Sequence, residues 1–262
     1  MIRRLFYYTL IIFAFYSGNT AAQISGISNS KVVVPGAETV RTGVFEFEPA
    51  FEVFSSSGEW DSNGNLTSSD SLSTESSHGF RFTTGVKENL EVGMIVPSDV
   101  SSLNFGLKWL FWNRNDFSFA FQSGLNFDAA NGNILKKEGR GKVLGSGLVA
   151  TYEPEGNYSV DSDISFSFYS NDVNGYPVGH SGTLNIGASY GLTNDFSGVV
   201  EYNFNWIKFE SEILNAEKGS GLVGFTYYAS QAAKIIMGLE YDIHGSNNVK
   251  GITYIIAFTF LI

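Results

Sequence analysis

Residues 117–127 read Phe-Ser-Phe-Ala-Phe-Gln-Ser-Gly-Leu-Asn-Phe, and this stretch decides the fold. Successive side chains of a β-strand point to opposite faces, so residues two apart share a face. One face would carry Phe117, Phe119, Phe121, Leu125 and Phe127, and the other would carry Ser118, Ala120, Gln122, Gly124 and Asn126. Alternation of this kind predicts a β-strand with one apolar and one polar face.

The same alternation recurs along the chain on both sides of this stretch. Together these segments predict an all-β fold of about twelve antiparallel strands. The predicted strands are 45–53, 80–86, 90–96, 103–111, 117–127, 143–152, 158–168, 184–190, 196–206, 221–229, 235–243 and 252–262. Pro49 lies within the first strand and cannot donate a ladder hydrogen bond, so we expect a bulge or kink there.

The connections between the predicted strands alternate in length. Tight turns follow the even-numbered strands, and most connections after the odd-numbered strands are long and polar. Outer-membrane barrels have this layout, with short periplasmic turns and longer external loops. In hydrocarbon every backbone N–H and C=O must be paired internally, which a sheet achieves only by closing on itself. The pattern therefore predicts a transmembrane antiparallel up-and-down β-barrel in the outer membrane; a soluble secreted β-sandwich is the alternative.

The first 22 residues have the composition of a secretory signal peptide. Arg3 and Arg4 precede an apolar stretch from Leu5 to Tyr16, and Thr20 and Ala22 occupy the −3 and −1 positions of a cleavage site. The apolar stretch is shorter than the roughly 20 residues of a spanning helix, although an uncleaved anchor is the alternative. We expect three segments: a signal peptide (1–22), a periplasmic leader (23–42) and an outer-membrane β-barrel (43–262).

Composition excludes several classes of function. The formal net charge is −10, and removing the two arginines of the signal peptide makes the rest still more negative. Nucleic acid is therefore an unsuitable partner, because phosphates require clustered Lys and Arg. The chain has no cysteine, so it forms neither a disulfide nor a thiolate metal site. No metal-ligand spacing, phosphate loop or nucleophile motif is present, and we expect no metal and no cofactor.

Four motifs give the chain a family resemblance. They are Pro35-Gly36-Ala37-Glu38-Thr39 followed by Gly43 and Phe45-Glu46-Phe47-Glu48, then Gly85-Val86-Lys87-Glu88-Asn89-Leu90-Glu91-Val92-Gly93, Phe105-Gly106-Leu107-Lys108-Trp109 and Gly191-Leu192-Thr193-Asn194-Asp195-Phe196. With them the chain resembles the MetA-pathway phenol-degradation family of outer-membrane transporters, from about residue 34 to the end. The resemblance implies a pore or uptake protein for small, aromatic or hydrophobic molecules. The chain departs from the usual barrel ending, because it finishes Phe260-Leu261-Ile262 and not on a terminal Phe.

If the apolar faces point to lipid, the polar faces line the lumen. The acidic lumen candidates are Glu46, Glu48, Glu52, Glu91, Asp161, Asp163, Glu201, Glu240 and Asp242, and the basic ones are Arg81, Lys108 and Lys234. An acidic lumen would repel anions and admit cations or neutral solutes. The alternative is a structural core of ion pairs and waters, because unpaired buried charge is costly.

Three histidines fall near the loop-side ends of strands, at His78, His180 and His244. Asp242 and His244 are two apart, so they would share a face and could form an Asp–His pair. Histidines at such positions are more commonly surface polar residues than catalytic ones. We therefore expect no catalytic residue, and we expect that the protein is not an enzyme.

Passive transport through a narrow barrel is the leading functional hypothesis. A non-conducting structural or surface-interaction barrel is the second, and an outer-membrane hydrolase is a remote third. The expected partners are outer-membrane lipid, the barrel-assembly machinery during insertion and a small-molecule solute. The Ser-rich segment 55–77 is predicted as a loop, either a receptor or adhesion surface or a solvated loop.

Overall fold

The computed structural model describes residues 26–68, 73–128, 142–169, 178–209, 211 and 214–262. The signal peptide predicted for residues 1–22 therefore lies outside the described residues. The strands are β1 (Phe45–Trp60), β2 (Leu66–Ser68), β3 (Thr74–Lys87), β4 (Leu90–Pro97), β5 (Ser102–Arg114), β6 (Phe117–Asp128), β7 (Lys142–Tyr152), β8 (Tyr158–Tyr169), β9 (Val178–Gly191), β10 (Phe196–Phe209), β11 (Ala216–Ser230), β12 (Ala233–Ser246) and β13 (Asn248–Leu261). No helix in this described part of the chain is long and apolar enough to span a membrane.

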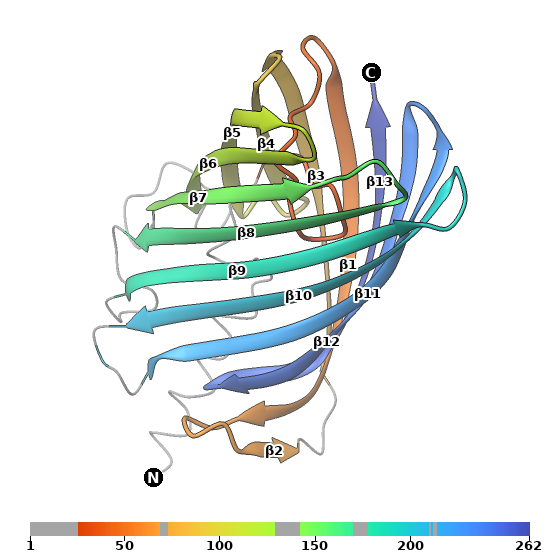
Figure 1. The fold of residues 1–262 in the computed structure, drawn as a ribbon. Helices are drawn as coiled ribbons and strands as arrows, with labels where there is room; N and C mark the ends of the chain where they lie inside the picture. The colour runs from red at the N-terminus through yellow and green to blue at the C-terminus, as the bar shows by residue number, and fades with distance from the viewer. Residues whose placement is uncertain (1–25, 69–72, 129–141, 170–177, 210, 212–213) are drawn as a thin grey trace.

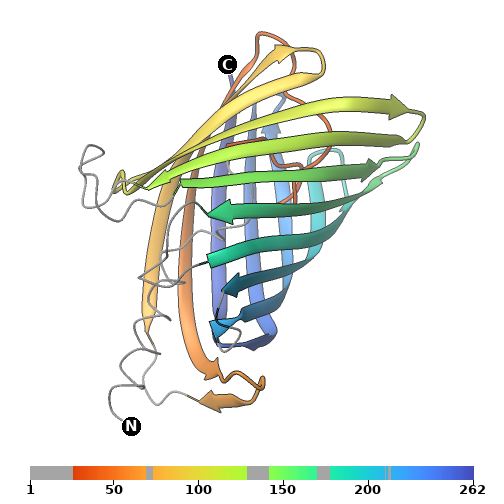
Figure 2. The ribbon, with the colours of Figure 1, turned by 90° about the vertical axis from the view of Figure 1, so that its left-hand side faces the viewer.

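The strands form one closed antiparallel barrel (Figures 1 and 2). Each strand from β4 to β12 pairs with both of its neighbours in sequence, β3 pairs with β4 and β1, and β13 returns to pair with β1. The short β2 pairs with the loop-side end of β1 at Gly58–Trp60, so the barrel wall has twelve strands, β1 and β3–β13. Phe45 and Ile262 exchange two backbone hydrogen bonds of 2.9 and 2.8 Å at the turn side, which closes the barrel there. The predicted twelve-stranded barrel is confirmed.

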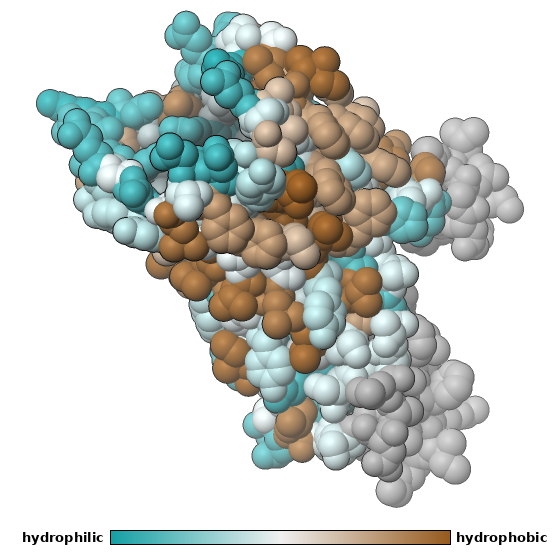
Figure 3. Space-filling view, turned by 90° about the vertical axis from the view of Figure 1, so that its right-hand side faces the viewer, coloured by the Kyte–Doolittle hydropathy of each residue, from teal (hydrophilic) through white to brown (hydrophobic). Residues whose placement is uncertain are grey.

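The two faces of the wall differ in the way the alternation predicts. Along β8, Asp161, Asp163 and Ser165 are buried, whereas Ile164 and Phe166 are 38% and 40% exposed. Hydrophobic side chains cover much of the outer face in Figure 3. An exposed apolar belt of this extent is unfavourable in water and is the surface that a lipid bilayer requires. The outer-membrane location predicted from the sequence follows from this belt and from the closed sheet.

Two local predictions in β1 are wrong. The predicted loop 55–77 is largely strand, because β1 continues to Trp60, β2 folds back on it and β3 begins at Thr74. The predicted bulge at Pro49 is absent, since the register between β1 and β13 is the same at Phe47 and at Ala50. The register shifts between Ser56 and Gly58 instead, which leaves Ser57 as the extra residue of a bulge.

Candidate functional site

The described part of the predicted leader, residues 26–42, lies inside the barrel and not in the periplasm. The path begins against β4 and β5, where a Cβ on Gly26 would lie 2.9 Å from the backbone of both Gly93 and Gly106. It ends at Thr42, which forms a parallel β-bridge with Gly85 at the turn side of β3. Figure 2 shows this red segment within the ring of strands. Carboxylates that point inward from the wall accept backbone N–H groups of this segment and hold it inside the barrel.

Residues 28–40 form a loop across the lumen, which we name the leader loop. Its two arms meet at Glu91 of β4, which accepts hydrogen bonds from the backbone N–H of Ser28 at 2.8 Å and of Val40 at 2.7 Å. Lys108 of β5 donates from Nζ to the carbonyl of Ser28 at 3.2 Å and to that of Gly36 at 2.9 Å. Lys108 and Glu91 also form an ion pair of 3.3 Å, with both side chains almost fully buried. This pair, which we name the clasp, therefore joins both arms of the loop to the wall.

The far part of the leader loop is held by two further carboxylates. Lys31 forms a buried ion pair with Asp161 of β8, and its Nζ donates to Ser159 at 3.0 Å. Glu201 of β10 accepts the backbone N–H groups of Val32 at 2.7 Å and of Val33 at 3.1 Å. A carboxylate that accepts several N–H groups forms the stronger, charge-assisted kind of hydrogen bond.

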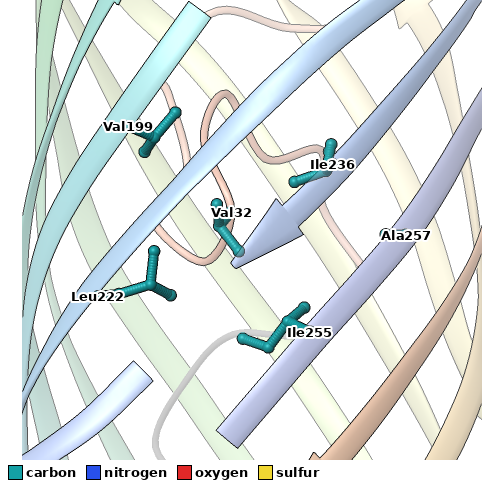
Figure 4. Packing of buried hydrophobic residues seen from close by; sticks show 6 residues of the cluster. All are labelled: Val32, Val199, Leu222, Ile236, Ile255 and Ala257. Carbon is teal, nitrogen blue, oxygen red and sulfur yellow. The ribbon is translucent and has the colours of Figure 1, made fainter. Parts of the chain in front are cut away.

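Apolar contacts also hold the leader loop in place. Val32 packs against a cluster on the inner face of β10–β13, shown in Figure 4, whose members are Val199, Leu222, Ile236, Ile255 and Ala257. On the opposite side Ala37 packs against Ala120 and Val149 of β6 and β7, while its N–H donates to Thr151 Oγ1 at 2.8 Å. Burying one aliphatic side chain stabilises the seated loop by about 1.5–3 kcal/mol. Polar anchors and apolar contacts thus both hold it.

A second buried charge cluster lies at the seam where the barrel closes. Arg81 of β3 donates from Nη2 to Glu46 at 2.9 Å and to Glu48 at 2.8 Å, both on β1. Thr259 of β13 donates to the same Glu48 at 2.5 Å. This group, which we name the seam cluster, joins β13, β1 and β3 across the inside of the wall.

The remaining predicted lumen residues also occupy inward positions of the strands. Asp163 accepts a hydrogen bond of 2.9 Å from Asn185. Asp242 pairs with Lys218 at 3.2 Å, a cation that the sequence pattern did not identify as a lumen residue. The other three are half-buried: Glu240 accepts from Asn203 and Ser220, Glu52 accepts from Ser77, and Lys234 lies near the turn end of β12. The placement of the twelve residues follows the alternation, while their part in permeation stays a prediction.

The predicted Asp242–His244 pair is wrong. The register between β11 and β12 shifts at this point, because Gly219 pairs with His244 and Ser220 pairs with Asp242. Ile243 is the extra residue of this bulge, so Asp242 points into the barrel and His244 points outward. His244 instead lies 2.9 Å from the hydroxyl of Tyr202 on the outer face. The arrangement on which the hydrolase alternative depended is therefore not formed.

Sequence reasoning missed the residues of the leader loop that fill the site. The signal was present in Lys31-Val32-Val33-Val34-Pro35, an apolar run within a segment that otherwise looks irregular. An apolar run of this kind is expected to be buried in the folded chain. Among the described residues, no group of three or more His, Cys, Asp or Glu side chains is placed to hold a metal ion.

Comparisons with known proteins support this fold. The chain is similar to the crystal structure of the COG4313 outer membrane channel from Pseudomonas putida F1, with a TM-score of 0.68 and 14% identity over 90% of this chain and 100% of that chain. It is also similar to the NanC porin structure, with a TM-score of 0.55 and 7% identity over 81% of this chain and 98% of that chain. No family model and no curated protein matches the sequence. At these identities the likeness establishes the outer-membrane barrel fold alone.

Proposed function

We propose that the chain is an outer-membrane channel for small molecules and that the leader loop closes it. The observation that carries the proposal is the position of residues 28–40, which span the lumen from the clasp to the inner face of β10–β13. The solved structures with similar folds include an outer membrane channel and a porin, which supports a transport function. Because the segment that closes the lumen is part of the same chain, we regard the leader loop as the gate of this channel.

The contacts of the loop suit a part that can move. Each polar anchor is a hydrogen bond or ion pair that water could replace, and the net value of such a bond is modest, about 0.5–1.5 kcal/mol for neutral groups and 1.5–3 kcal/mol for charged ones. The strands, in contrast, are joined by continuous ladders of backbone pairs. Release of the leader loop therefore requires far less free energy than opening of the wall.

Release would also change the charge of the lumen. Lys31 would leave with the loop, and Glu91, Asp161 and Glu201 would lose partners that they have in the closed state. The twelve predicted lumen residues include nine carboxylates and three cations. The open lumen would therefore favour cations or neutral solutes over anions.

The solute class is argued from the family resemblance and from the wall. We propose that the chain belongs to the MetA-pathway phenol-degradation family and takes up small, uncharged aromatic or hydrophobic molecules. The apolar cluster on the inner face of β10–β13 supports this, because the rest of the lumen wall is mostly polar. A non-conducting structural or surface-interaction barrel is the second candidate, and the tight fit of the loop favours it.

Conductance across planar bilayers tests the proposal. A variant that lacks residues 28–38 should conduct steadily and prefer cations, while the full chain should conduct rarely. Thr42→Asp, an exposed change in the leader outside the loop, should behave as the full chain does. Absence of conductance in the deletion variant, once its barrel is shown to be folded, would support the structural barrel and reject the channel.

A further inference from the structure

The side chain of Val32 sits over two glycines of the barrel wall. Gly224 of β11 and Gly238 of β12 are directly paired across the two strands. A Cβ on Gly224 would lie 3.0 Å from Val32 Cγ2, and one on Gly238 would lie 2.9 Å from Val32 Cγ1. Leu222 and Ile236 each precede one of the glycines by two residues, so they lie on the same inner face. Figure 4 shows both side chains near that of Val32. We name this depression, floored by Gly224 and Gly238 and walled by Leu222 and Ile236, the socket.

Gly238 leaves room for a side chain, because the atoms that a Cβ there would meet belong to the side chains of Val32 and Leu222. At Gly224 a Cβ would also clash with the carbonyl oxygen of Met237, so this glycine serves both the neighbouring backbone and Val32. Both glycines lie within strands, and neither is among the described glycines with a positive φ. Glycine within a strand costs conformational entropy and packs no side chain, and it often marks a site where another group approaches closely. Here the approaching group is the isopropyl group of Val32.

The socket would be exposed to water whenever the leader loop leaves. Leu222 and Ile236 are each 2% exposed in the closed state. Their exposure would be unfavourable, so a small apolar molecule that entered the socket would stabilise the open state. A ligand shifts a conformational equilibrium only by its difference in affinity for the two states. In the closed state Val32 occupies the socket, so the ligand would bind the open state alone.

We propose that the socket is a binding site for a small uncharged apolar group, a branched alkyl chain or a single aromatic ring, which replaces the side chain of Val32 and opens the channel. The proposal rests on the proposed function, because it requires the leader loop to move. The walls and floor of the socket offer aliphatic side chains and bare backbone, so shape and burial select the ligand. The ligand and the gate thus compete for the same surface.

The absence of cysteine from the chain allows a direct test. Val32→Cys in the full-length protein, reconstituted in phospholipid vesicles, should react slowly with a cationic methanethiosulfonate reagent, because residue 32 is buried in the socket. Toluene should raise the modification rate by about tenfold, because the rate follows the population of the open state and a tenfold rise in that population raises it by the same factor. Glycerol at the same concentration should leave the rate unchanged.

Two variants of the socket and one matched control complete the test. In the Val32→Cys background, Gly238→Ala fills the floor and Ile236→Thr adds a hydroxyl to the wall, and each should abolish the response to toluene. Gly221→Ala places its Cβ on the outer face of β11, 3.2 Å from Ile243 Cδ1, and should retain the response.

Three results would overturn the socket. They are a rate that toluene does not change, a response that persists in both socket variants, and rapid modification of the Val32→Cys variant without toluene. Steady conductance of the variant without residues 28–38 would leave the channel standing after the first or second result. Loss of that conductance would reject the channel itself, so the two failures are distinguishable.

Discussion

The seam cluster and the clasp are built from the same kinds of residue but hold different things together. In the seam cluster Arg81, Glu46 and Glu48 join strand to strand. In the clasp Lys108 and Glu91 join the wall to the leader loop. The first is a permanent part of the barrel, whereas the second holds a segment that the proposed function requires to move. Buried charge in a barrel lumen is therefore not by itself evidence of a permeation path.

The largest effect is expected from breaking the seam cluster. Arg81→Met leaves Glu46 and Glu48 buried without their cation, and removing one partner of a buried ion pair costs about 3–5 kcal/mol. The barrel should unfold at a markedly lower urea concentration, as measured by the mobility of unheated samples on gels. Arg114→Met, at the exposed end of β5, is the control. Equal midpoints for the two variants would contradict the structural role of the seam.

Breaking the clasp should release the leader loop and leave the barrel intact. Lys108→Met removes charged hydrogen bonds worth about 1.5–3 kcal/mol each from both arms of the loop. Trypsin should then cleave after Lys31, which is 1% exposed in the closed state.

The control for the clasp is Lys218→Met, which removes a wall lysine paired with Asp242. It should leave Lys31 protected. If both lysine variants expose Lys31 equally, or neither does, the distinction between clasp and wall is lost.

A smaller effect is expected at Glu201, which holds the tip of the loop. Glu201→Gln keeps an acceptor oxygen but removes the charge, so the bonds to Val32 and Val33 should weaken by about 1 kcal/mol. The rate of tryptic cleavage after Lys31 should rise by several-fold. Asp163→Asn changes a wall carboxylate that bonds to Asn185, and it should have no such effect; an identical rise in both variants would argue against a specific contact.

The smallest effect lies outside the lumen, in the turn after β1. The side chain and backbone of Asn65, and then the N–H of Asn63, donate to Asp61 and lower the pKa of its carboxyl below the ordinary value. The stabilisation is present above the unfolded pKa and is lost as pH falls through the lower, folded pKa. The protection factors of the Asn63 and Asn65 amides, which correct the exchange rates for their intrinsic pH dependence, should fall over that acidic range alone. Asp61→Asn should remove the pH dependence, and its persistence in that variant would assign it to another group.

The sequence predicted the barrel because membrane burial imposes a strict rule on every strand. Residues such as Phe119 and Phe121 must face lipid, and Gln122 must then face inward, whatever the neighbouring strands are. The same rule placed the twelve charged lumen candidates. It failed between Asp242 and His244 because a bulge adds one residue and reverses the face of those beyond it.

The leader loop could not be predicted by this rule because it is not a strand. Its position depends on contacts such as Ser28 with Glu91 and Val32 with Gly224, whose partners are far apart in the sequence. Periodicity carries no information on such pairs. The valine run at 32–34 indicates burial, but only the closed barrel shows where that burial occurs.

A reversible cross-link between the loop and the wall tests the central claim most directly. Ala37 packs against Val149 in the closed state, so Ala37→Cys with Val149→Cys in this cysteine-free chain should form a disulfide. We predict that the oxidised protein does not conduct in planar bilayers and that reduction of the disulfide restores openings. The same conductance before and after reduction, in protein whose disulfide is shown to have formed, would contradict closure of the lumen by the leader loop.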